Sequence, residues 1–189
     1  SAGTTGLRIF DRLHRRTDIQ LLTLPESERK LEASRKKMLN EADVVFLCLP
    51  DDAACEAALW VENPDTVVLD TSTAHRTAPG WCYGFPELSP VQEARLRQAK
   101  RIAVPGCHAS GFIALVYPLV SAGLLTPDAL LSCYSLTGYS GGGKKMIAQY
   151  EAEEKDPLLG APRQYALGQT HKHLKEMKAI TGLANEPVF

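Results

Sequence analysis

Short apolar runs alternate with longer segments of mixed polarity along the first hundred residues of the chain. The runs are rich in β-branched residues, which is typical of buried strands. The segments between them have the spacing or composition of helices. The predicted strands are 19–24, 43–49, 66–70 and 101–104, and the predicted helices are 6–15, 26–41, 52–62 and 90–100. Strands buried on both faces and joined by helices predict a mostly parallel α/β sheet.

The pattern changes after Cys107. An apolar helix over 111–121 is followed by a predicted strand over 130–136, a glycine-rich loop and a helix over 144–153. This change predicts a domain boundary near residues 105–111.

Composition and charge narrow the function classes. The 189 residues are 44% hydrophobic and 23% charged, which is ordinary for a globular protein. A formal net charge of −1 gives no overall attraction to nucleic acid or to a membrane surface, so neither partner is expected. Five cysteines without regular spacing argue against a disulfide framework and favour a reducing compartment. A cytoplasmic enzyme is therefore expected.

The run Pro105-Gly106-Cys107 connects a predicted strand to a predicted helix. Proline and glycine favour a sharp turn, which places Cys107 at or just before a helix N-terminus. Free N–H groups and the helix dipole at such a terminus favour an anion, and the thiolate is the reactive form of cysteine. Cys107 is therefore the candidate nucleophile. A buried, inert cysteine is the alternative, and it is the interpretation kept for the other four cysteines.

A cysteine nucleophile needs a partner for proton transfer, and the run from 169 to 177 contains two histidines. His173 and Glu176 lie three positions apart on one helix face, so the carboxylate could orient an imidazole. A pair of exposed histidines at a helix start is the alternative. A zinc site of Cys107, His108, His171 and His173 is a further alternative, but no established zinc-binding spacing supports it.

Two predicted strands end in polar, turn-forming residues, and ligands of open α/β sheets bind outside such ends. Leu49-Pro50-Asp51-Asp52 follows the strand at 43–49, and its two aspartates are interpreted as helix caps. Arg76 lies shortly after the strand at 66–70. Its guanidinium could bind a carboxylate or phosphate through two hydrogen bonds, and a surface ion pair is the alternative.

Two glycine-containing loops precede predicted helices. In the first, Gly3 and Gly6 have the spacing of the last two glycines of a dinucleotide-binding turn, although an ordinary helix cap is an alternative. The second loop, 137–145, contains three adjacent glycines whose N–H groups could bind an anion. It lacks the ending of a nucleotide triphosphate loop, and a flexible connection is its alternative.

Together these motifs resemble the N-acetyl-γ-glutamyl-phosphate reductase family, in particular its shorter bacterial type. The resemblance covers essentially the whole chain. The stretches that carry it are SAGTTG at 1–6, FLCLPDDAA at 46–54, STAHRTAPGWCYGFPEL at 72–88, PGCHASGF at 105–112, SLTGYSGGGKKMIAQYE at 135–151 and GQTHKHLKEM at 168–177.

The resemblance implies a Rossmann-type NADP domain over 1–108 and an α+β catalytic and dimerisation domain over 109–189. It implies NADPH-dependent reduction of N-acetyl-L-glutamyl 5-phosphate to the 5-semialdehyde, with release of phosphate, through a thioester in arginine biosynthesis. It also implies a homo-oligomer, a dimer or tetramer, and no metal. Its site residues are Cys107, His171, His173 and Glu176 for catalysis, Arg76 and Ser110 for substrate, and Ser1, Gly3, Thr4, Thr5, Gly6, Pro50, Ser72, Ser140, Gly141 and Gly142 for the cofactor.

The chain departs from the family pattern at three places. Lys175 stands where the family usually has proline, the strand expected before the first glycine loop is absent, and relatives continue beyond Phe189. We therefore expect a chain that is incomplete at both ends, with sheet neighbours missing beside 19–24 and 130–136. Two alternative functions are an aspartate-semialdehyde-dehydrogenase-like enzyme and an NADP-binding fragment without activity.

Overall fold

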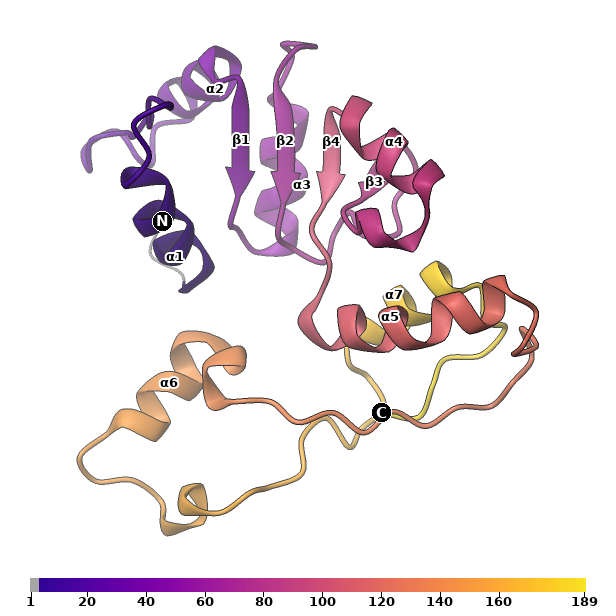
Figure 1. The fold of residues 1–189 in the computed structure, drawn as a ribbon. Helices are drawn as coiled ribbons and strands as arrows, with labels where there is room; N and C mark the ends of the chain where they lie inside the picture. Colours follow the sequence, from indigo (N-terminus) through magenta and orange to yellow (C-terminus); the bar gives the residue numbers. More distant parts are fainter. Residues whose placement is uncertain (1–3) are drawn as a thin grey trace.

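A computed structural model of the chain describes residues 4–189 (Figure 1). Its centre is a parallel sheet in the order β1-β2-β4-β3, so the predicted parallel sheet is confirmed. The strands are β1 (Val44–Leu47), β2 (Val67–Asp70), β3 (Cys82–Tyr83) and β4 (Arg101–Ala103). The helices of this half are α1 (Thr4–His14), α2 (Glu32–Glu41), α3 (Asp51–Leu59) and α4 (Pro90–Gln98), and a short 3-10 turn, η1, covers Pro86–Leu88.

One face of the sheet carries most of its core. Val45 and Leu47 of β1 and Val68 of β2 are buried together with Ala57 of α3. Successive side chains of a strand point to opposite faces, and β1 alternates between exposed and buried positions. The prediction of strands buried on both faces is therefore wrong for β1, because α3 covers only one face of this strand (Figure 1).

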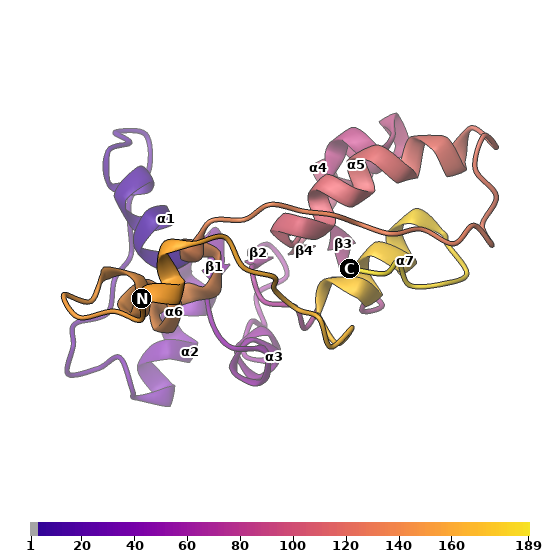
Figure 2. The ribbon, with the colours of Figure 1, turned by 90° about the horizontal axis from the view of Figure 1, so that it is seen from below.

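The second half of the chain is built on two helices that pack against each other. The helix α5 (Cys107–Ser121) contributes Phe112 and Ile113 to a shared core, and α7 (His173–Thr181) contributes Leu174 and Met177. Between these helices the chain makes a long excursion that contains η2 (Tyr139–Gly142), α6 (Gly143–Glu151) and η3 (Pro157–Gly160). Figures 1 and 2 both place α6 on the same side of the molecule as α1.

Two predicted strands are wrong. Residues 19–24 form no regular structure and pair with no strand among residues 4–189, and both Ile19 and Leu22 are about 40% exposed. The segment 130–136 forms one isolated bridge, between Ser132 and Val188. A β-branched or apolar run becomes a strand only where a neighbour accepts its backbone hydrogen bonds, and these runs lack such a neighbour along most of their length.

The other predicted elements are confirmed with shifted ends. Helix α2 begins at Glu32 rather than at residue 26, and α5 begins at Cys107, four residues before its predicted start. Within residues 4–189, no helix has both the length and the apolar character that crossing a bilayer requires.

Candidate functional site

The chain segments that leave β1, β2 and β4 all emerge at the carboxyl edge of the parallel sheet, which faces α5 and α7 (Figure 1). Pro50 follows β1 in the sequence and is the N-cap residue of α3, and Ser72 lies in the turn that follows β2. Gly106 follows β4 in the sequence and is the N-cap residue of α5. The two stretches predicted to line a ligand crevice are therefore at one edge of the sheet, together with the turn that precedes Cys107.

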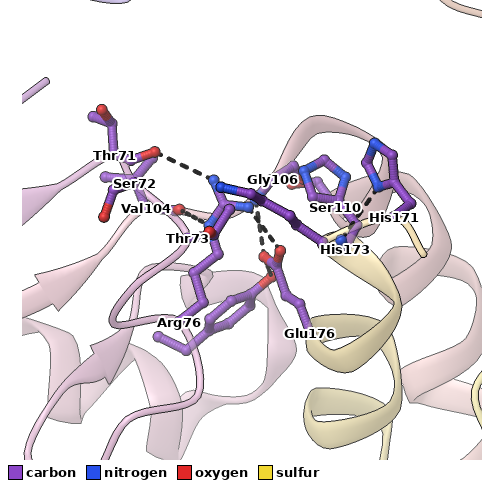
Figure 3. Close-up of polar contacts among 12 residues, drawn as sticks. Thr71, Ser72, Thr73, Arg76, Val104, Gly106, Ser110, His171, His173 and Glu176 are labelled. Atoms are coloured by element: carbon purple, nitrogen blue, oxygen red, sulfur yellow. Dashed lines mark hydrogen bonds and ion pairs between the residues drawn. The ribbon is translucent and has the colours of Figure 1, made fainter. Parts of the chain in front are cut away.

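A buried carboxylate on α7 binds three segments of this edge (Figure 3). Glu176 is only 2% exposed. Its Oε2 accepts a hydrogen bond of 2.9 Å from Arg76 Nη1. Its Oε1 accepts one of 2.6 Å from the hydroxyl of Tyr83 and one of 2.8 Å from the N–H of Gly106. The positive charge of Arg76 and the two further donors compensate for the removal of this carboxylate from water.

Arg76 points into the protein rather than toward solvent (Figure 3). Besides its ion pair with Glu176, it donates from Nε to the carbonyl of Val104 at 3.0 Å and from Nη2 to the carbonyl of Thr71 at 3.3 Å. The sequence predicted a substrate anion as its partner, with a surface ion pair as the alternative. The structure gives Arg76 a buried partner within the chain, so the surface ion pair is wrong, and the contact with a substrate anion stays a prediction.

Cys107 is exposed and is the first residue of α5, so its predicted position at a helix start is confirmed. Gly106 before it is buried, and a Cβ at this position would collide with the imidazole of His173 and the guanidinium of Arg76. The turn before Cys107 therefore requires glycine for a steric reason. Ser110 directs its hydroxyl to the Gly106 carbonyl at 2.8 Å, within its own helix.

The two histidines of the 169–177 run have different surroundings. His173 is 8% exposed, its Nδ1 has no hydrogen-bond partner among residues 4–189, and its Nε2 edge faces Gly106. His171 Nδ1 accepts the N–H of His173 at 3.2 Å, and its Nε2 lies 3.4 Å from the Tyr165 hydroxyl. The expected hydrogen bond from an imidazole to Glu176 is not formed, because the donors of Arg76, Tyr83 and Gly106 already occupy that carboxylate.

A third imidazole joins this pair. His108, the residue after Cys107, lies with its ring 5.7 Å from the rings of both His171 and His173, and its Nδ1 is 2.7 Å from Ser135 Oγ. Burial lowers the pKa of His173 to about 3, helped by the nearby His171 and Arg76. Burial also lowers the pKa values of His108 and His171. The lowered pKa values keep these rings neutral near neutral pH.

The predicted cofactor residues divide into several groups. Ser1 and Gly3 lie outside the described residues. Thr4, Thr5 and Gly6 form the first turn of α1, and Gly6 is buried there. A helix that begins within the glycine turn, with a buried glycine in its first turn, fits the pyrophosphate of a dinucleotide. Ser140, Gly141 and Gly142 lie in η2, directly before α6.

Ser72 is hydrogen-bonded to Asp70, whose carboxylate is fully buried at the end of β2. Asp70 accepts the N–H of Ser72 at 2.9 Å and its hydroxyl at 2.6 Å, and His75 Nδ1 lies 2.6 Å from the same carboxylate. The His75 ring stacks on Trp81 at 3.9 Å. The turn behind β2 is therefore fixed by side chains rather than left mobile.

The search for a metal site over residues 4–189 finds no group of three or more histidine, cysteine, aspartate or glutamate side chains arranged to hold an ion. The zinc alternative therefore gains no support. Sequence reasoning assigned no role to Tyr83 and none outside that zinc alternative to His108. Tyr83 lies inside the long 72–88 stretch, but nothing in the sequence pointed its hydroxyl at a residue 93 positions away.

Comparison with known proteins agrees with this arrangement. Residues 1–96 match the family model described as "Semialdehyde dehydrogenase, NAD binding domain", and residues 107–188 match "Semialdehyde dehydrogenase, dimerisation domain". The first match confirms the predicted nicotinamide-dinucleotide domain.

Curated relatives cover nearly the whole chain. N-acetyl-gamma-glutamyl-phosphate reductase 2 of Pseudomonas putida is 48% identical over 189 residues, which are 99% of this chain and 59% of that protein. N-acetyl-gamma-glutamyl-phosphate reductase of Chelativorans sp. is 49% identical over 187 residues, 99% of this chain and 60% of that protein. The chain thus spans about 60% of the length of these relatives, and the resemblance predicted from the motifs is confirmed.

Solved structures give the fold alone. Aspartate semialdehyde dehydrogenase from Francisella tularensis superposes with a TM-score of 0.59 at 10% identity, covering 98% of this chain and 67% of that one. Aspartate semialdehyde dehydrogenase II from Vibrio cholerae gives a TM-score of 0.52 at 15% identity, covering 79% of this chain and 51% of that one. The predicted α/β fold class is confirmed.

Proposed function

Because this chain belongs to the semialdehyde dehydrogenase family, we propose that it carries the cofactor-binding and nucleophile machinery of an N-acetyl-γ-glutamyl-phosphate reductase. Its reaction is the NADPH-dependent reduction of N-acetyl-L-glutamyl 5-phosphate to the 5-semialdehyde, with release of phosphate, in arginine biosynthesis. Relatives of that name, at 45–49% identity over almost the whole chain, support the assignment. The observation that carries it is the exposed Cys107 at the start of α5, directly after Gly106, which the ring of the buried His173 faces.

Cys107 is the nucleophile of this proposal. Its thiolate attacks the acyl carbon, the bond from that carbon to the phosphate oxygen breaks, and phosphate leaves with the electron pair of that bond. In α5 the first amide bonded within the helix is that of Ser110, which donates to the Gly106 carbonyl. The earlier N–H groups of the first turn have no partner within the helix and can stabilise the oxyanion that forms during attack. The dinucleotide, when bound, supplies a hydride to the resulting thioester.

His173 is the residue we assign to proton transfer. Both nitrogens of His171 have partners, since Nδ1 accepts the His173 N–H and Nε2 faces Tyr165. His173 faces the nucleophile turn at Gly106, and its lowered pKa keeps the ring neutral, which leaves a nitrogen free to receive the thiol proton. The same lowered pKa makes this imidazole a weak base, so the transfer also needs the start of α5 to stabilise the thiolate. His171 then acts as the residue that orients the start of α7.

Glu176 and Arg76 are positioning residues in this proposal, because their partners are groups of the protein. A guanidinium has five N–H groups, and Arg76 uses three of them for hydrogen bonds within the protein. The other two can contact a substrate anion. Ser110 retains the lone pairs of its hydroxyl for the same purpose.

The cofactor site of the proposal combines the first turn of α1 with the turns after β1 and β2. Thr4, Thr5 and Gly6 hold the pyrophosphate, Pro50 and Ser72 line the edge of the sheet, and 140–142 approach from the α6 side. We further propose NADPH as the cofactor form, 1–108 and 109–189 as the two domains, a dimer or tetramer as the assembly, and the cytoplasm as the compartment.

The test is NADPH oxidation that depends on N-acetylglutamyl phosphate, measured on this chain and on its Cys107→Ser variant. Turnover by the parent and loss of turnover with unchanged NADPH affinity in the variant are the expected results. Aspartyl phosphate in the same assay tests the alternative that the folds of aspartate semialdehyde dehydrogenases suggest. NADPH binding without turnover on either substrate would favour a non-catalytic dinucleotide-binding chain.

A further inference from the structure

Two donors from different segments share one oxygen of Glu176. The Tyr83 hydroxyl and the Gly106 N–H both bind Oε1, at 2.6 and 2.8 Å, while Arg76 binds Oε2. Gly106 immediately precedes the nucleophile Cys107. A single carboxylate oxygen therefore connects the Tyr83 hydroxyl to the backbone that precedes the Cys107 thiol.

Tyr83 is rigidly held. It belongs to β3, pairs with Ala103 of β4, and is 7% exposed in the core that includes Ala109 and Phe112 of α5. The side chain of Gln92 donates to its carbonyl. Burial and the adjacent Glu176 raise the pKa of the Tyr83 hydroxyl, so this group stays protonated and remains a donor.

We propose that Tyr83 is a positioning residue for the nucleophile: its hydroxyl fixes Oε1 of Glu176, and that oxygen fixes the Gly106 N–H at the start of α5. The catalytic consequence rests on the proposed function, whereas the consequence for the Cys107 thiol does not.

The reason lies in what Glu176 would do without this donor. A guanidinium binds a carboxylate most readily through two parallel hydrogen bonds. Without the Tyr83 hydroxyl, the Glu176 carboxylate could rotate toward Arg76. Both of its oxygens would then bind the guanidinium, and the Gly106 N–H would lose its acceptor. Glycine has no side chain to restrain its backbone, so the turn before Cys107 would then sample more conformations. The Tyr83 hydroxyl opposes that rotation.

The experiment compares Tyr83→Phe with Tyr134→Phe in the full chain. Tyr134 is 90% exposed and serves as the matched control. Three quantities are measured: the alkylation rate of Cys107 by iodoacetamide, amide hydrogen exchange of a peptide covering 104–107, and the kcat and KM of NADPH oxidation. For Tyr83→Phe we expect alkylation and kcat to fall on the order of tenfold, as for the loss of one hydrogen bond to a charged group. Exchange at 104–107 should accelerate, and KM for NADPH should not change.

A second variant makes the test independent of one substitution. Glu176→Asp keeps the charge opposite Arg76 but withdraws the carboxylate from Gly106, so it should give the same signature. Adding Tyr83→Phe to Glu176→Asp should change little further, because both act through one contact. If Tyr83→Phe does not fold, unchanged alkylation and exchange in Glu176→Asp would still overturn the proposal, because the contact from Tyr83 to Gly106 passes through that carboxylate.

Unchanged alkylation and exchange in the folded variants, or additive effects in the double variant, would overturn the proposal. A chain without turnover whose alkylation and exchange still respond to Tyr83→Phe would support the positioning role and contradict the proposed function instead.

Discussion

Cys107 and Cys55 are both exposed, and they differ in their positions along their helices. Cys107 opens α5, whereas Cys55 lies in the middle of α3, where the backbone N–H groups are already bonded within the helix. Burial raises the pKa values of Cys48 and Cys133, and Cys82 is buried. Position, rather than exposure, therefore distinguishes the candidate nucleophile from the other accessible thiol.

We predict that iodoacetamide at limiting concentration labels Cys107 before the other four cysteines of the folded chain. Peptide mapping by mass spectrometry measures the order of labelling. Cys55→Ser is the control and should leave the Cys107 rate unchanged. Equal rates for Cys107 and Cys55 would contradict the assignment of the nucleophile.

The buried His173 predicts a pH dependence of stability. Burial lowers its pKa from an ordinary value near 6.5 to about 3, so between these values the unfolded chain binds a proton that the folded chain does not. The free energy of unfolding therefore rises with pH across this window. At pH 5 it is lower than at pH 7 by about 1–2 kcal/mol. The lowered pKa values of His108 and His171 act in the same direction. Asp51, whose pKa is lowered to about 2, does not titrate between pH 5 and 6.5.

Urea denaturation at pH 7 and pH 5 measures this difference. His173→Asn should reduce the loss of stability on acidification, and the exposed His14→Asn serves as the matched control. A variant at His173 that loses as much stability at pH 5 as the parent would show that burial of this imidazole is not the cause.

At the scale of elements, α7 is tied to the sheet half by two ion pairs of different kinds. Arg76 and Glu176 are 8% and 2% exposed, whereas Lys172 and Asp51 are 66% and 33% exposed. Removing one partner of a buried pair leaves an uncompensated charge and costs about 3–5 kcal/mol. An exposed pair contributes at most about 1 kcal/mol, because water and salt screen it.

We therefore predict that Arg76→Met lowers the free energy of unfolding far more than Lys172→Met. Arg76→Lys should restore little, because an ammonium cannot reach Glu176 and the carbonyls of Val104 and Thr71 together. Chemical denaturation in low and high salt distinguishes the two ion pairs. The loss of unfolding free energy caused by Lys172→Met should become smaller in high salt, whereas the loss caused by Arg76→Met should not. Similar losses for the two methionine variants would contradict the assignment of Arg76 to a buried pair.

The sequence predicted most elements, and its failures have a common cause. Helices hydrogen-bond within themselves, so local spacing was sufficient for α1, α3, α4, α5 and α6. Strands depend on neighbours, which is why 19–24 and 130–136 were wrong and the two-residue β3 was not foreseen. β3 exists only because β4 pairs with it.

The candidate site divides in the same way. The position of Cys107 followed from a local turn, so the sequence was sufficient to predict it. The partner of Glu176 was predicted from helical spacing as an imidazole, but the carboxylate instead binds Arg76 and Tyr83, which lie 100 and 93 positions away. Local spacing identifies which side chains share a helix face, but it gives no information about donors brought to that face by another part of the fold.

At the scale of the whole molecule, the turn before the candidate nucleophile Cys107 lies between the sheet and α7 (Figure 1). Gly106 is bound on one side by the carboxylate of α7, which in turn is held by Arg76 and Tyr83 from the sheet half. The geometry around Cys107 therefore depends on both halves of the chain together, and a change in the contact between the halves changes the site.

The part that matches a dimerisation domain also exposes many large apolar side chains. Leu115 of α5 is 73% exposed, and Leu130 and Leu136 are 84% and 83% exposed. Leu130, Tyr134 and Leu136 are all highly exposed within one seven-residue segment. Exposed apolar residues that lie close together mark interaction surfaces, so we predict that the chain self-associates through this part. Light scattering over a range of concentrations should show a mass that grows with concentration and that Leu115→Lys and Leu130→Lys reduce. Leu59→Lys, at an 82% exposed leucine of α3, should leave the association unchanged, because α3 lies outside the matched domain. An equal reduction by Leu59→Lys would show nonspecific apolar contact rather than a defined interface.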